Sequence, residues 1–331
     1  MGVKGIKSRR VRCLLCPKEC ELGEGERGNC RVRINLYGKL QTLVYGAAVA
    51  ANIDPIEKKP IYHMLPGSGA FSIATAGCNL HCKFCQNWEI SQMEPEEVKN
   101  FPLSPEAVVY NALAGGCRSI AYTYSEPTIF YEYMMDTASF AREKALKNLM
   151  ITAGFIKPGP LRELCRVIDG ANVDLKGFTE QYYRDICDGE LKPVMRSLEI
   201  IREEGVWLEI TNLIVPTLND DMRLIADMCC WIRDALGEDT VLHFSRFFPM
   251  YRLKNLPPTP VETLEMARKV AMDTGLRYVY TGNVPGHSGE STYCPGCGQT
   301  LIKRYGFWVA QNNIRNGRCS RCGEVIPGVW E

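Results

Sequence analysis

The sequence predicts an α/β fold: a partial (β/α)6-type TIM barrel with a small Cys-rich element at its N-terminal end and a zinc ribbon at its C-terminal end. Two observations carry this prediction. Between residues 71 and 281, apolar β-rich runs alternate with stretches of helical periodicity, which is typical of parallel strands covered by helices. Most of the 16 cysteines gather near the two ends of the chain and after the first apolar run, which predicts metal sites.

These observations divide the chain into three predicted regions. Residues 1–66 would hold a four-cysteine element and a hairpin, residues 67–288 the barrel, and residues 289–331 the ribbon. A length of 331 residues allows a barrel-sized core with small appendages. The N-terminus lacks an apolar signal core, so we expect reduced cysteines, and their clustering favours metal over disulfides.

Four cysteines near the N-terminus follow a C-x2-C-x3-C-x9-C pattern: Cys13, Cys16, Cys20 and Cys30. The Gly-rich segment between the last two has little hydrophobic content, so we expect a bound metal to fix its shape. Tetrahedral zinc and an auxiliary 4Fe–4S cluster both suit four thiolates, and the spacing does not decide between them. Four unrelated thiols are the alternative.

The segment between these cysteines and the barrel is predicted to contain a hairpin and a connector. Alternation over residues 31–49 predicts the hairpin, with its turn at residues 37–39. Residues 53–67 form a Pro-rich connector. Its charged run at residues 57–59 is expected to be a solvated face, with the border of an active-site mouth as the alternative.

The barrel region contains seven predicted strands: 71–76, 118–124, 149–154, 171–175, 206–213, 240–246 and 277–281. The predicted helices lie near 104–115, 127–147, 160–168, 192–204, 219–236 and 260–274. In such barrels the chemistry takes place at the C-terminal ends of the strands, so the loops after these runs hold the candidate site residues.

Three cysteines follow the first barrel strand with the spacing C-x3-C-x2-C: Cys78, Cys82 and Cys85. Three thiolates would leave one iron of a 4Fe–4S cluster without a protein ligand. That iron could chelate the amino and carboxylate groups of S-adenosylmethionine (SAM), and an electron passed through the cluster could cleave the sulfonium to a 5'-deoxyadenosyl radical. Three core cysteines, or a zinc knuckle completed by His81, are the alternatives.

This loop, with Phe84 before its last cysteine, resembles the radical SAM superfamily. After the second strand, Glu126 followed by Pro127 resembles the Gly-Gly-Glu-Pro motif of that superfamily, with Tyr124 and Ser125 in place of the glycines. A carboxylate at this position could accept the α-ammonium of SAM. A glutamate favoured by a helix N-terminus is the alternative.

Further candidates follow the next strands. Asp174 and Lys176 end the fourth strand, where buried charges are costly unless they are used or paired, and we take both as candidate catalytic residues. These two residues, and the segment that begins at Thr152, resemble the glycyl-radical-enzyme activase branch, which implies positions near the cofactor. The end of the fifth strand is similar to the ribose-contacting stretch of that branch, which implies Asn212 as a SAM contact.

The loop after the last strand is polar and Gly-rich and contains His287 and Glu290. Its position would let it cover the active site, so we consider both residues as acid–base or substrate contacts. A plain linker is the alternative.

The C-terminal tail contains two C-x2-C-Gly units around a hairpin-like stretch at residues 301–309. Their four thiolates predict a closed, tetrahedral zinc site. The ligands would be Cys294, Cys297, Cys319 and Cys322.

Motifs spread over nearly the whole chain look like those of the radical enzyme of the AmmeMemoRadiSam system. They are the N-terminal Cys-x2-Cys-Pro-x2-Cys element, the Gln-Asn-Trp-Glu-Ile-Ser-Gln segment after Cys85, the Thr-Gly-Asn-Val-Pro-Gly-His segment, and the terminal Ile-Pro-Gly-Val-Trp. That family is similar to pyruvate formate-lyase activating enzymes, and the resemblance implies Amme-type and Memo-type proteins as partners.

Composition limits the remaining possibilities. A net charge of +1 argues against a broad nucleic-acid or membrane-binding surface. No apolar run approaches the ~20 residues of a transmembrane helix, so we expect a cytoplasmic protein. The leading hypothesis is a radical SAM enzyme served by a flavodoxin- or ferredoxin-type donor. An activase of a glycyl-radical enzyme, and a metal-stapled protein that binds a partner or RNA, are the alternatives.

Overall fold

The computed structural model describes residues 10–331. Its centre is an eight-stranded sheet in the order β14-β13-β12-β11-β10-β9-β7-β6, and the two end strands do not pair, so the barrel is partial. The other seven strands of this sheet run parallel to one another, whereas β6 (Ala50–Pro55) is antiparallel to β7. The parallel strands are β7 (Gly69–Ala74), β9 (Ser119–Tyr122), β10 (Lys147–Thr152), β11 (Gly170–Asp174), β12 (Trp207–Ile214), β13 (Val241–Arg246) and β14 (Val279–Gly282).

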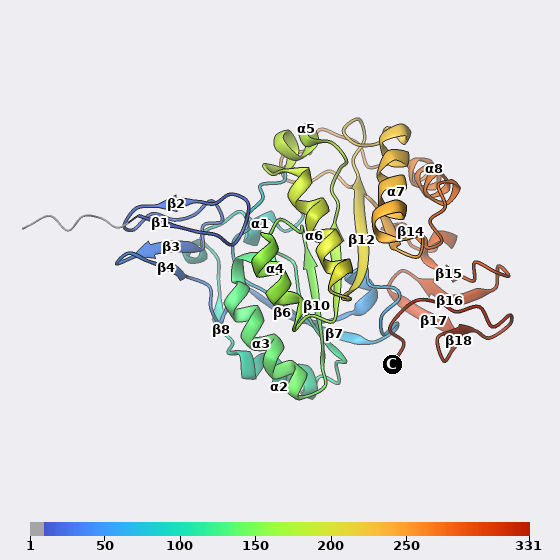
Figure 1. Ribbon diagram of the computed structural model, residues 1–331, viewed down its shortest axis with the longest axis horizontal. Coiled ribbons are helices and arrows are strands. Elements are labelled where there is room, and N and C mark those ends of the chain that lie inside the picture. The colour runs from blue at the N-terminus through green and yellow to red at the C-terminus, as the bar shows by residue number, and fades with distance from the viewer. Residues whose placement is uncertain (1–9) are drawn as a thin grey trace, which may run out of the picture.

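Helices between successive strands cover the outer face of this sheet (Figure 1). They are α2 (Pro105–Ala114), α3 (Tyr131–Glu143), α4 (Pro158–Cys165), α6 (Leu191–Glu203), α7 (Met222–Leu236) and α8 (Val261–Asp273). All six overlap the predicted helices, and capping explains some of the shifted ends. Asp221 accepts a hydrogen bond from the Arg223 amide, so α7 begins at residue 222 and not at 219. Shorter helical turns are η1 (Ile56–Lys58), α1 (Trp88–Ser91), η2 (Pro95–Glu97), η3 (Pro127–Phe130), α5 (Glu180–Tyr182), η4 (Tyr183–Cys187) and η5 (Ser288–Glu290).

Burial of helix faces against the strands stabilises this arrangement. In α6, Val194, Leu198 and Ile201 recur at helical spacing and are fully buried. Each such side chain contributes roughly 1.5–3 kcal/mol when it leaves water. The helix therefore packs against α4 and β12, and β12 carries the predicted site residue Asn212. No helix among residues 10–331 is both long and apolar enough to cross a membrane.

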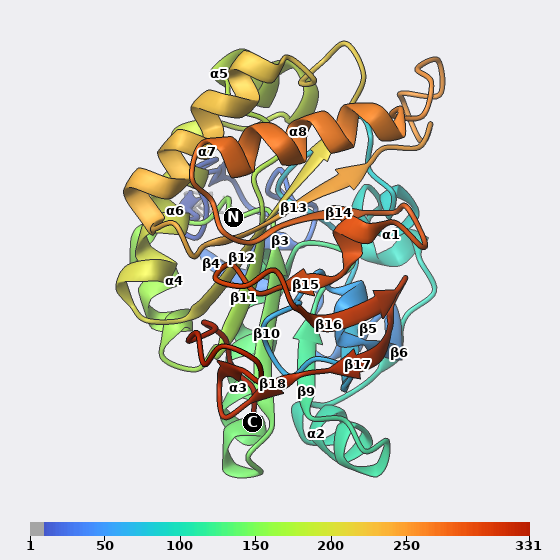
Figure 2. The same ribbon diagram turned by 90° about the vertical axis from the view of Figure 1, so that its right-hand side faces the viewer.

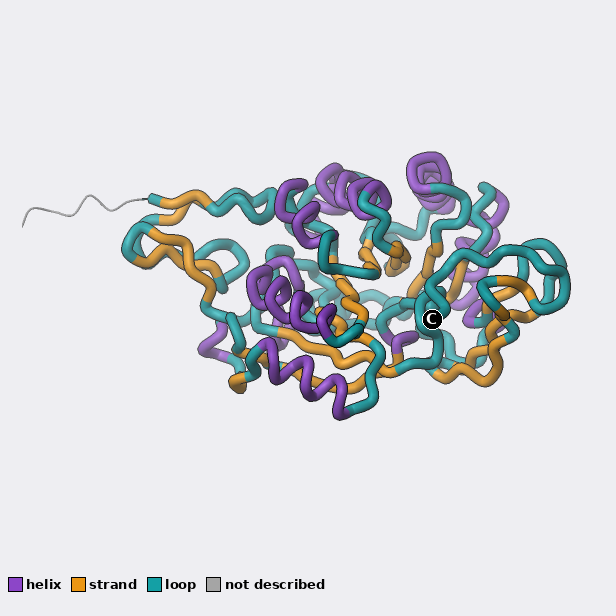
Figure 3. Tube along the Cα trace, turned by 60° about the horizontal axis from the view of Figure 1, so that its bottom comes forward, coloured by secondary structure: helices purple, strands orange, loops and turns teal. Residues whose placement is uncertain are grey.

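The N-terminal hairpins and the C-terminal ribbon lie at opposite ends of the molecule (Figures 1 and 3). The predicted hairpin is confirmed as β3 (Arg33–Leu36) and β4 (Lys39–Thr42), with Tyr37 and Gly38 both at positive φ in the turn. The other small strands on this side of the molecule are β1 (Val11–Arg12), β2 (Glu21–Leu22), β5 (Ala47–Ala48) and β8 (Phe101–Pro102).

The predicted connector is wrong in two respects. Residues 53–55 belong to the edge strand β6, where Pro55 costs no ladder hydrogen bond because it ends the strand. Two residues of the charged run are not solvated: Glu57 and Lys59 are 1% and 2% exposed, whereas Lys58 between them is exposed. Glu57 forms a buried ion pair with Arg304 of the ribbon at 3.6 Å, so this run holds the two regions together.

The ribbon strands are β15 (Thr292–Tyr293), β16 (Thr300–Tyr305), β17 (Trp308–Asn312), β18 (Ile314–Arg315) and β19 (Arg318–Cys319). Figure 2 views the molecule from this end, with β16 and β17 in front of the barrel strands. Arg304 donates to the Tyr62 carbonyl at 2.7 Å and to the Thr292 hydroxyl at 2.9 Å. The ribbon is therefore docked on the barrel through a buried guanidinium.

His63 lies in the same interface and makes its stability sensitive to pH. Its ring is fully buried between the Pro327 carbonyl (2.8 Å) and the Tyr280 hydroxyl (2.6 Å), so Nδ1 donates and Nε2 accepts. Burial lowers the pKa of His63 from 6.5 to about 4, against the opposing effect of Glu209. The neutral ring thus stabilises the fold above pH 6.5, and this stabilisation is lost as the pH falls towards 4.

We therefore expect wild-type protein to lose about 2 kcal/mol of unfolding free energy between pH 7.5 and pH 5 through this residue. Chemical denaturation at the two pH values measures the loss. In His63→Gln, which keeps a donor and an acceptor but does not titrate, the loss should be smaller by that amount. Equal pH dependence in the two proteins would contradict this account.

Candidate active site

A cavity of about 550 Å³ opens among the loops that follow the parallel strands. The chain positions its polar lining strand by strand, since the carboxyl ends of parallel strands meet at one edge. Predicted site residues that line it are Cys78, Cys82, Cys85, Glu126, Thr152, Asp174 and Lys176. The structure thus brings these seven residues together at one cavity.

The loop that carries the three cysteines is held on both sides by backbone hydrogen bonds. The His81 and Lys83 amides donate to the Cys187 and Ile186 carbonyls, each at 2.9 Å. The Cys85 sulfur lies 3.1 Å from the Ser91 hydroxyl. The backbone of this loop is therefore fixed with its three sulfurs on one wall of the cavity.

Burial disfavours the ionised forms of Cys78 and Cys85 unless a positively charged partner is present, whereas a hydrogen bond from Cys187 lowers the pKa of Cys82. Burial, together with the nearby Glu126 carboxylate, raises the pKa of Cys78 well above its ordinary value. Burial likewise raises the pKa of Cys85. The His81 ring contacts Gln92 at 2.6 Å and Asn29 at 3.0 Å, and it does not line the cavity. A zinc knuckle completed by His81 is therefore not formed, whereas the cysteines suit a metal cluster that supplies the positive charge.

Glu126 is 2% exposed and is held by four hydrogen bonds. Its Oε1 accepts from the Thr128 amide (3.0 Å), the Thr128 hydroxyl (2.7 Å) and the Thr152 hydroxyl (2.6 Å). Its Oε2 accepts only from the Ala153 amide, at 2.8 Å. Since each carboxylate oxygen offers about two acceptor sites, Oε2 retains one for a cationic ligand in the cavity.

Asp174 and Lys176 form an ion pair beside the cysteines. Their charged atoms lie 2.8 Å apart, and the Lys176 ammonium lies 5.8 Å from the centre of the Phe84 ring. Burial disfavours the charged lysine, but Asp174 and Cys82 hold the pKa of Lys176 well above its ordinary value. The side chain therefore places a positive charge next to the cysteine loop.

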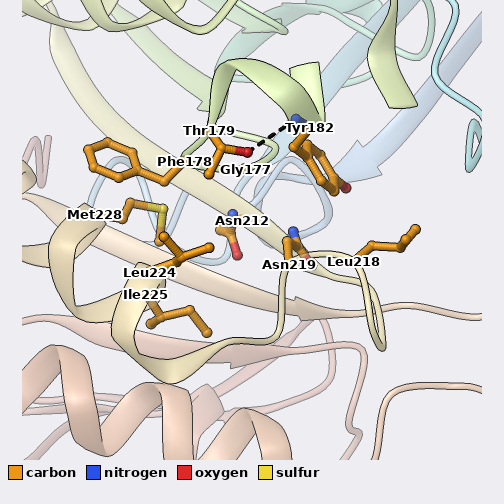
Figure 4. Close-up of a pocket in the computed structure, with 10 residues that line it drawn as sticks. All are labelled: Gly177, Phe178, Thr179, Tyr182, Asn212, Leu218, Asn219, Leu224, Ile225 and Met228. Atoms are coloured by element: carbon orange, nitrogen blue, oxygen red, sulfur yellow. Dashed lines mark hydrogen bonds between the residues drawn. The ribbon is translucent and has the colours of Figure 1, made fainter. Parts of the chain in front are cut away.

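The structure does not bring Asn212 to this cavity. Thr211 and Leu213, its neighbours in β12, line the cavity, and alternate strand residues face opposite sides. Asn212 instead donates to the Leu175 carbonyl at 2.7 Å and lines a separate pocket of about 20 Å³ (Figure 4). A SAM contact through its side chain does not agree with this position.

His287 and Glu290 also lie outside the cavity lining. The His287 ring bridges Thr281 (2.8 Å) and Glu265 (3.0 Å). Glu290 accepts from the Gly286 amide at 3.0 Å and the Gly306 amide at 3.1 Å. Glu290 thus joins the loop after β14 to the turn of the ribbon hairpin, and that turn carries a cavity-lining residue, Phe307.

A cluster of Asp54, Lys59 and Tyr124 is absent from the predicted site residues, but Lys59 and Tyr124 line the cavity, which agrees with the alternative that the run at residues 57–59 borders the active-site mouth. The Lys59 ammonium lies 2.6 Å from Asp54 and 4.3 Å from the centre of the Tyr124 ring, and the Tyr124 hydroxyl donates to Asp54. Burial lowers the pKa of Lys59 to about 8, although Asp54 acts in the opposite direction. Tyr124 has φ of +63°, a strained value where the resembling motif has glycine, and the Asn87 amide holds its carbonyl at 2.7 Å. Two features of the sequence point to this cluster, namely the departure from glycine at Tyr124 and the charged run at residues 57–59.

The ribbon cysteines converge as a metal site. All four sulfurs lie within 4.8 Å of one another, with Cys294 3.5 Å from Cys322 and Cys297 3.8 Å from Cys319. Tetrahedral zinc with Zn–S bonds of about 2.3 Å needs sulfurs at such separations. Among residues 10–331, no other set of three or more Cys, His, Asp or Glu ligand atoms lies this close together.

Comparisons with known proteins agree with the cysteine loop. Residues 72–229 match the family model of the radical SAM superfamily. The uncharacterized protein MJ0808 of Methanocaldococcus jannaschii is 46% identical over 331 residues, which span 99% of this chain and 98% of that protein. The chain belongs to the radical SAM superfamily.

Other radical SAM proteins are similar over part of the chain. The pyruvate formate-lyase-activating enzyme of Clostridium pasteurianum is 24% identical over 173 residues, or 50% of this chain and 70% of that enzyme. A radical SAM methyltransferase from Sphaerobacter thermophilus has the same fold, with a TM-score of 0.51 at 14% identity over 67% of this chain and 70% of that structure. The chain is therefore a radical SAM enzyme, and the superfamily implies a 4Fe–4S cluster and SAM.

Proposed function

We propose that Cys78, Cys82 and Cys85 hold a 4Fe–4S cluster, and that the enzyme reductively cleaves SAM to remove a hydrogen atom from a substrate in the 550 Å³ cavity. When bound, the cluster supplies the electron that breaks the sulfonium bond. One observation carries the proposal: the three cysteines and a buried carboxylate with a spare acceptor site open on the same cavity.

We assign the SAM contacts to residues on the strand ends beside the loop. Glu126 would accept a hydrogen bond from the α-amino group, and Thr152 fixes the Glu126 carboxylate through the 2.6 Å hydrogen bond. Asp174 and Lys176 flank the cysteines as an ion pair, where the ammonium suits the SAM carboxylate. The Asp54–Lys59–Tyr124 cluster remains for the substrate, since Lys59 and Tyr124 line the cavity and neither is assigned to SAM.

Anaerobic protein reduced with dithionite and mixed with SAM tests this function. We expect 5'-deoxyadenosine and methionine to form in amounts that depend on reductant and protein. Reconstituted protein that carries its cluster and binds SAM, yet yields neither product, would contradict the proposal.

Glu126→Gln should weaken SAM binding while leaving the cluster intact. The amide keeps the side-chain volume but loses the charge, and its NH2 group would face donors that now surround the carboxylate. A hydrogen bond to a charged group contributes about 1.5–3 kcal/mol, so the Kd for SAM should rise roughly 10- to 100-fold. Equilibrium binding to anaerobic protein measures it, with the exposed Glu106→Gln as the matched control. An unchanged Kd would remove Glu126 from the SAM site.

The remaining cofactors and partners are proposed as follows. Zinc is the ion that we assign to the ribbon. A flavodoxin- or ferredoxin-type protein would be the electron donor, and the resemblance to the AmmeMemoRadiSam system supports Amme-type and Memo-type proteins as partners. The similarity to the Clostridium activating enzyme also favours a second candidate function, activation of a glycyl-radical enzyme. A glycine-centred doublet in the electron paramagnetic resonance (EPR) spectrum of a partner would select that function.

A metal-stapled RNA-binding protein is the least supported function. A net charge of +1 provides little attraction for phosphates. Salt-sensitive RNA binding by protein that does not cleave SAM would favour it.

A further inference from the structure

The N-terminal four-cysteine element lies directly behind the loop that carries Cys78. Gly77 packs so closely on this element that a Cβ there would lie 2.6 Å from the Cys30 carbonyl oxygen. The His81 ring contacts Asn29 at 3.0 Å, and the Asn79 side chain lies against the Cys16 thiol. The two cysteine-bearing segments therefore share one interface, and no helix or strand separates them.

The four sulfurs of this element are not arranged as in the zinc ribbon. The ribbon sulfurs lie within 4.8 Å of one another, whereas among Cys13, Cys16, Cys20 and Cys30 no three do so. The cysteines of the Cys78 loop likewise form no set as close as that of the ribbon. A single zinc ion pulls its ligands together, whereas each ligand of an iron–sulfur cluster binds a different iron, so its sulfurs stand farther apart. The element therefore resembles the cluster site and not the zinc site.

The position of the element relative to the cavity argues against a role in binding substrate. None of its four cysteines lines the 550 Å³ cavity. Cys30 is 8% exposed and faces the Cys78 loop, while Cys20 is only partly buried and Leu14 is 57% exposed. A group held here would reach from the protein surface to the back of the Cys78 loop.

We propose that Cys13, Cys16, Cys20 and Cys30 bind a second iron–sulfur cluster, through which a flavodoxin- or ferredoxin-type donor reduces the cluster of the Cys78 loop. This inference rests on the proposed function for its acceptor. Each transfer moves one electron: the donor is oxidised by one electron, the N-terminal cluster is reduced and reoxidised, and the Cys78 cluster is reduced. No covalent bond forms or breaks in this step.

Metal analysis and spin counting of wild-type protein form the first test. Anaerobically purified protein should contain about eight iron and one zinc per chain, and full reduction should give EPR signals that integrate to about two spins. About four iron, two zinc and one spin would overturn the proposal, because the N-terminal site would then hold zinc.

The double variant Cys16→Ser, Cys20→Ser distinguishes electron transfer through the N-terminal cluster from SAM cleavage at the Cys78 loop. It should lose about four iron and retain 5'-deoxyadenosine formation with dithionite, a small reductant that needs no relay. Formation driven by reduced flavodoxin should fall at least about tenfold. Cys165→Ser, which changes a buried cysteine far from both sites in the chain, is the matched control. Undiminished flavodoxin-driven turnover in the double variant would overturn the relay.

A variant that lacks the Cys78-loop cysteines makes the two proposals distinguishable. It should keep the iron and the EPR signal of the N-terminal cluster even though SAM is not cleaved. If that signal is present while wild-type protein fails to cleave SAM, the proposed function fails and the second cluster stands. If the signal is absent while wild-type protein cleaves SAM, the second cluster fails alone.

Discussion

Replacement of Cys78, Cys82 and Cys85 together by alanine is expected to abolish 5'-deoxyadenosine formation. The three sulfurs lie on one wall of the cavity, and no other cysteine lines it. Loss of the ligands removes the cluster, and with it about four iron per chain. Chromatographic quantification of 5'-deoxyadenosine, together with iron analysis, measures both effects.

Cys117→Ala is the control for this variant, because Cys117 is a buried cysteine outside the cavity lining. It should retain wild-type iron content and activity. Circular dichroism should show that the triple variant remains folded, since the sheet and its helices do not depend on the loop. A folded triple variant that formed 5'-deoxyadenosine at the wild-type rate would refute the assignment of the site.

Loss of the ribbon metal is expected to unfold the C-terminal ribbon. In the double variant Cys294→Ser, Cys319→Ser we expect no bound zinc, because two of four ligands that converge within 4.8 Å are removed. Structural zinc contributes about 10–16 kcal/mol of apparent binding free energy in zinc-finger peptides, so the ribbon should unfold. Zinc analysis and limited proteolysis of the ribbon hairpin measure the two effects.

Unfolding of the ribbon should also reach the active site. Phe307 of the hairpin turn lines the cavity, and Glu290 fixes that turn through the Gly306 amide at 3.1 Å. Cys230→Ser, outside the ribbon, is the matched control and should keep zinc and resist proteolysis. A double variant that retained one zinc and a protected hairpin would show that these cysteines are not the ligands.

The parts of the fold that depend on local patterns could be predicted from the sequence. Alternating apolar runs and periodic helices predicted the seven parallel strands and the six long helices between them, and the cysteine spacing predicted the cluster-binding loop and the metal site of the ribbon. Ends of elements shifted where a side chain cap decided them, as Asp221 does for α7. These features need only contacts within a few residues.

The errors concern residues whose positions depend on distant partners. Asn212 was assigned as a SAM contact from a resembling segment. Neighbouring residues of a strand face opposite sides of the sheet, and in β12 it is Thr211 that faces the cavity. The burial of Glu57 depends on Arg304, which is 247 residues away in the sequence. The Glu57–Arg304 ion pair has no local signal, whereas the cavity position of Lys59 agrees with the alternative that the run at residues 57–59 borders the active-site mouth. The role of Glu290 also depends on a distant contact, because its carboxylate joins the loop after β14 to the turn of the ribbon hairpin.

The EPR spectrum of the reduced enzyme before and after addition of SAM tests whether the Cys78-loop cluster binds SAM. If SAM binds the iron that the three cysteines leave free, its addition should change the g-values of the signal assigned to the Cys78-loop cluster. The triple cysteine variant should show no such change. A wild-type spectrum that stays the same at saturating SAM would contradict the proposed function.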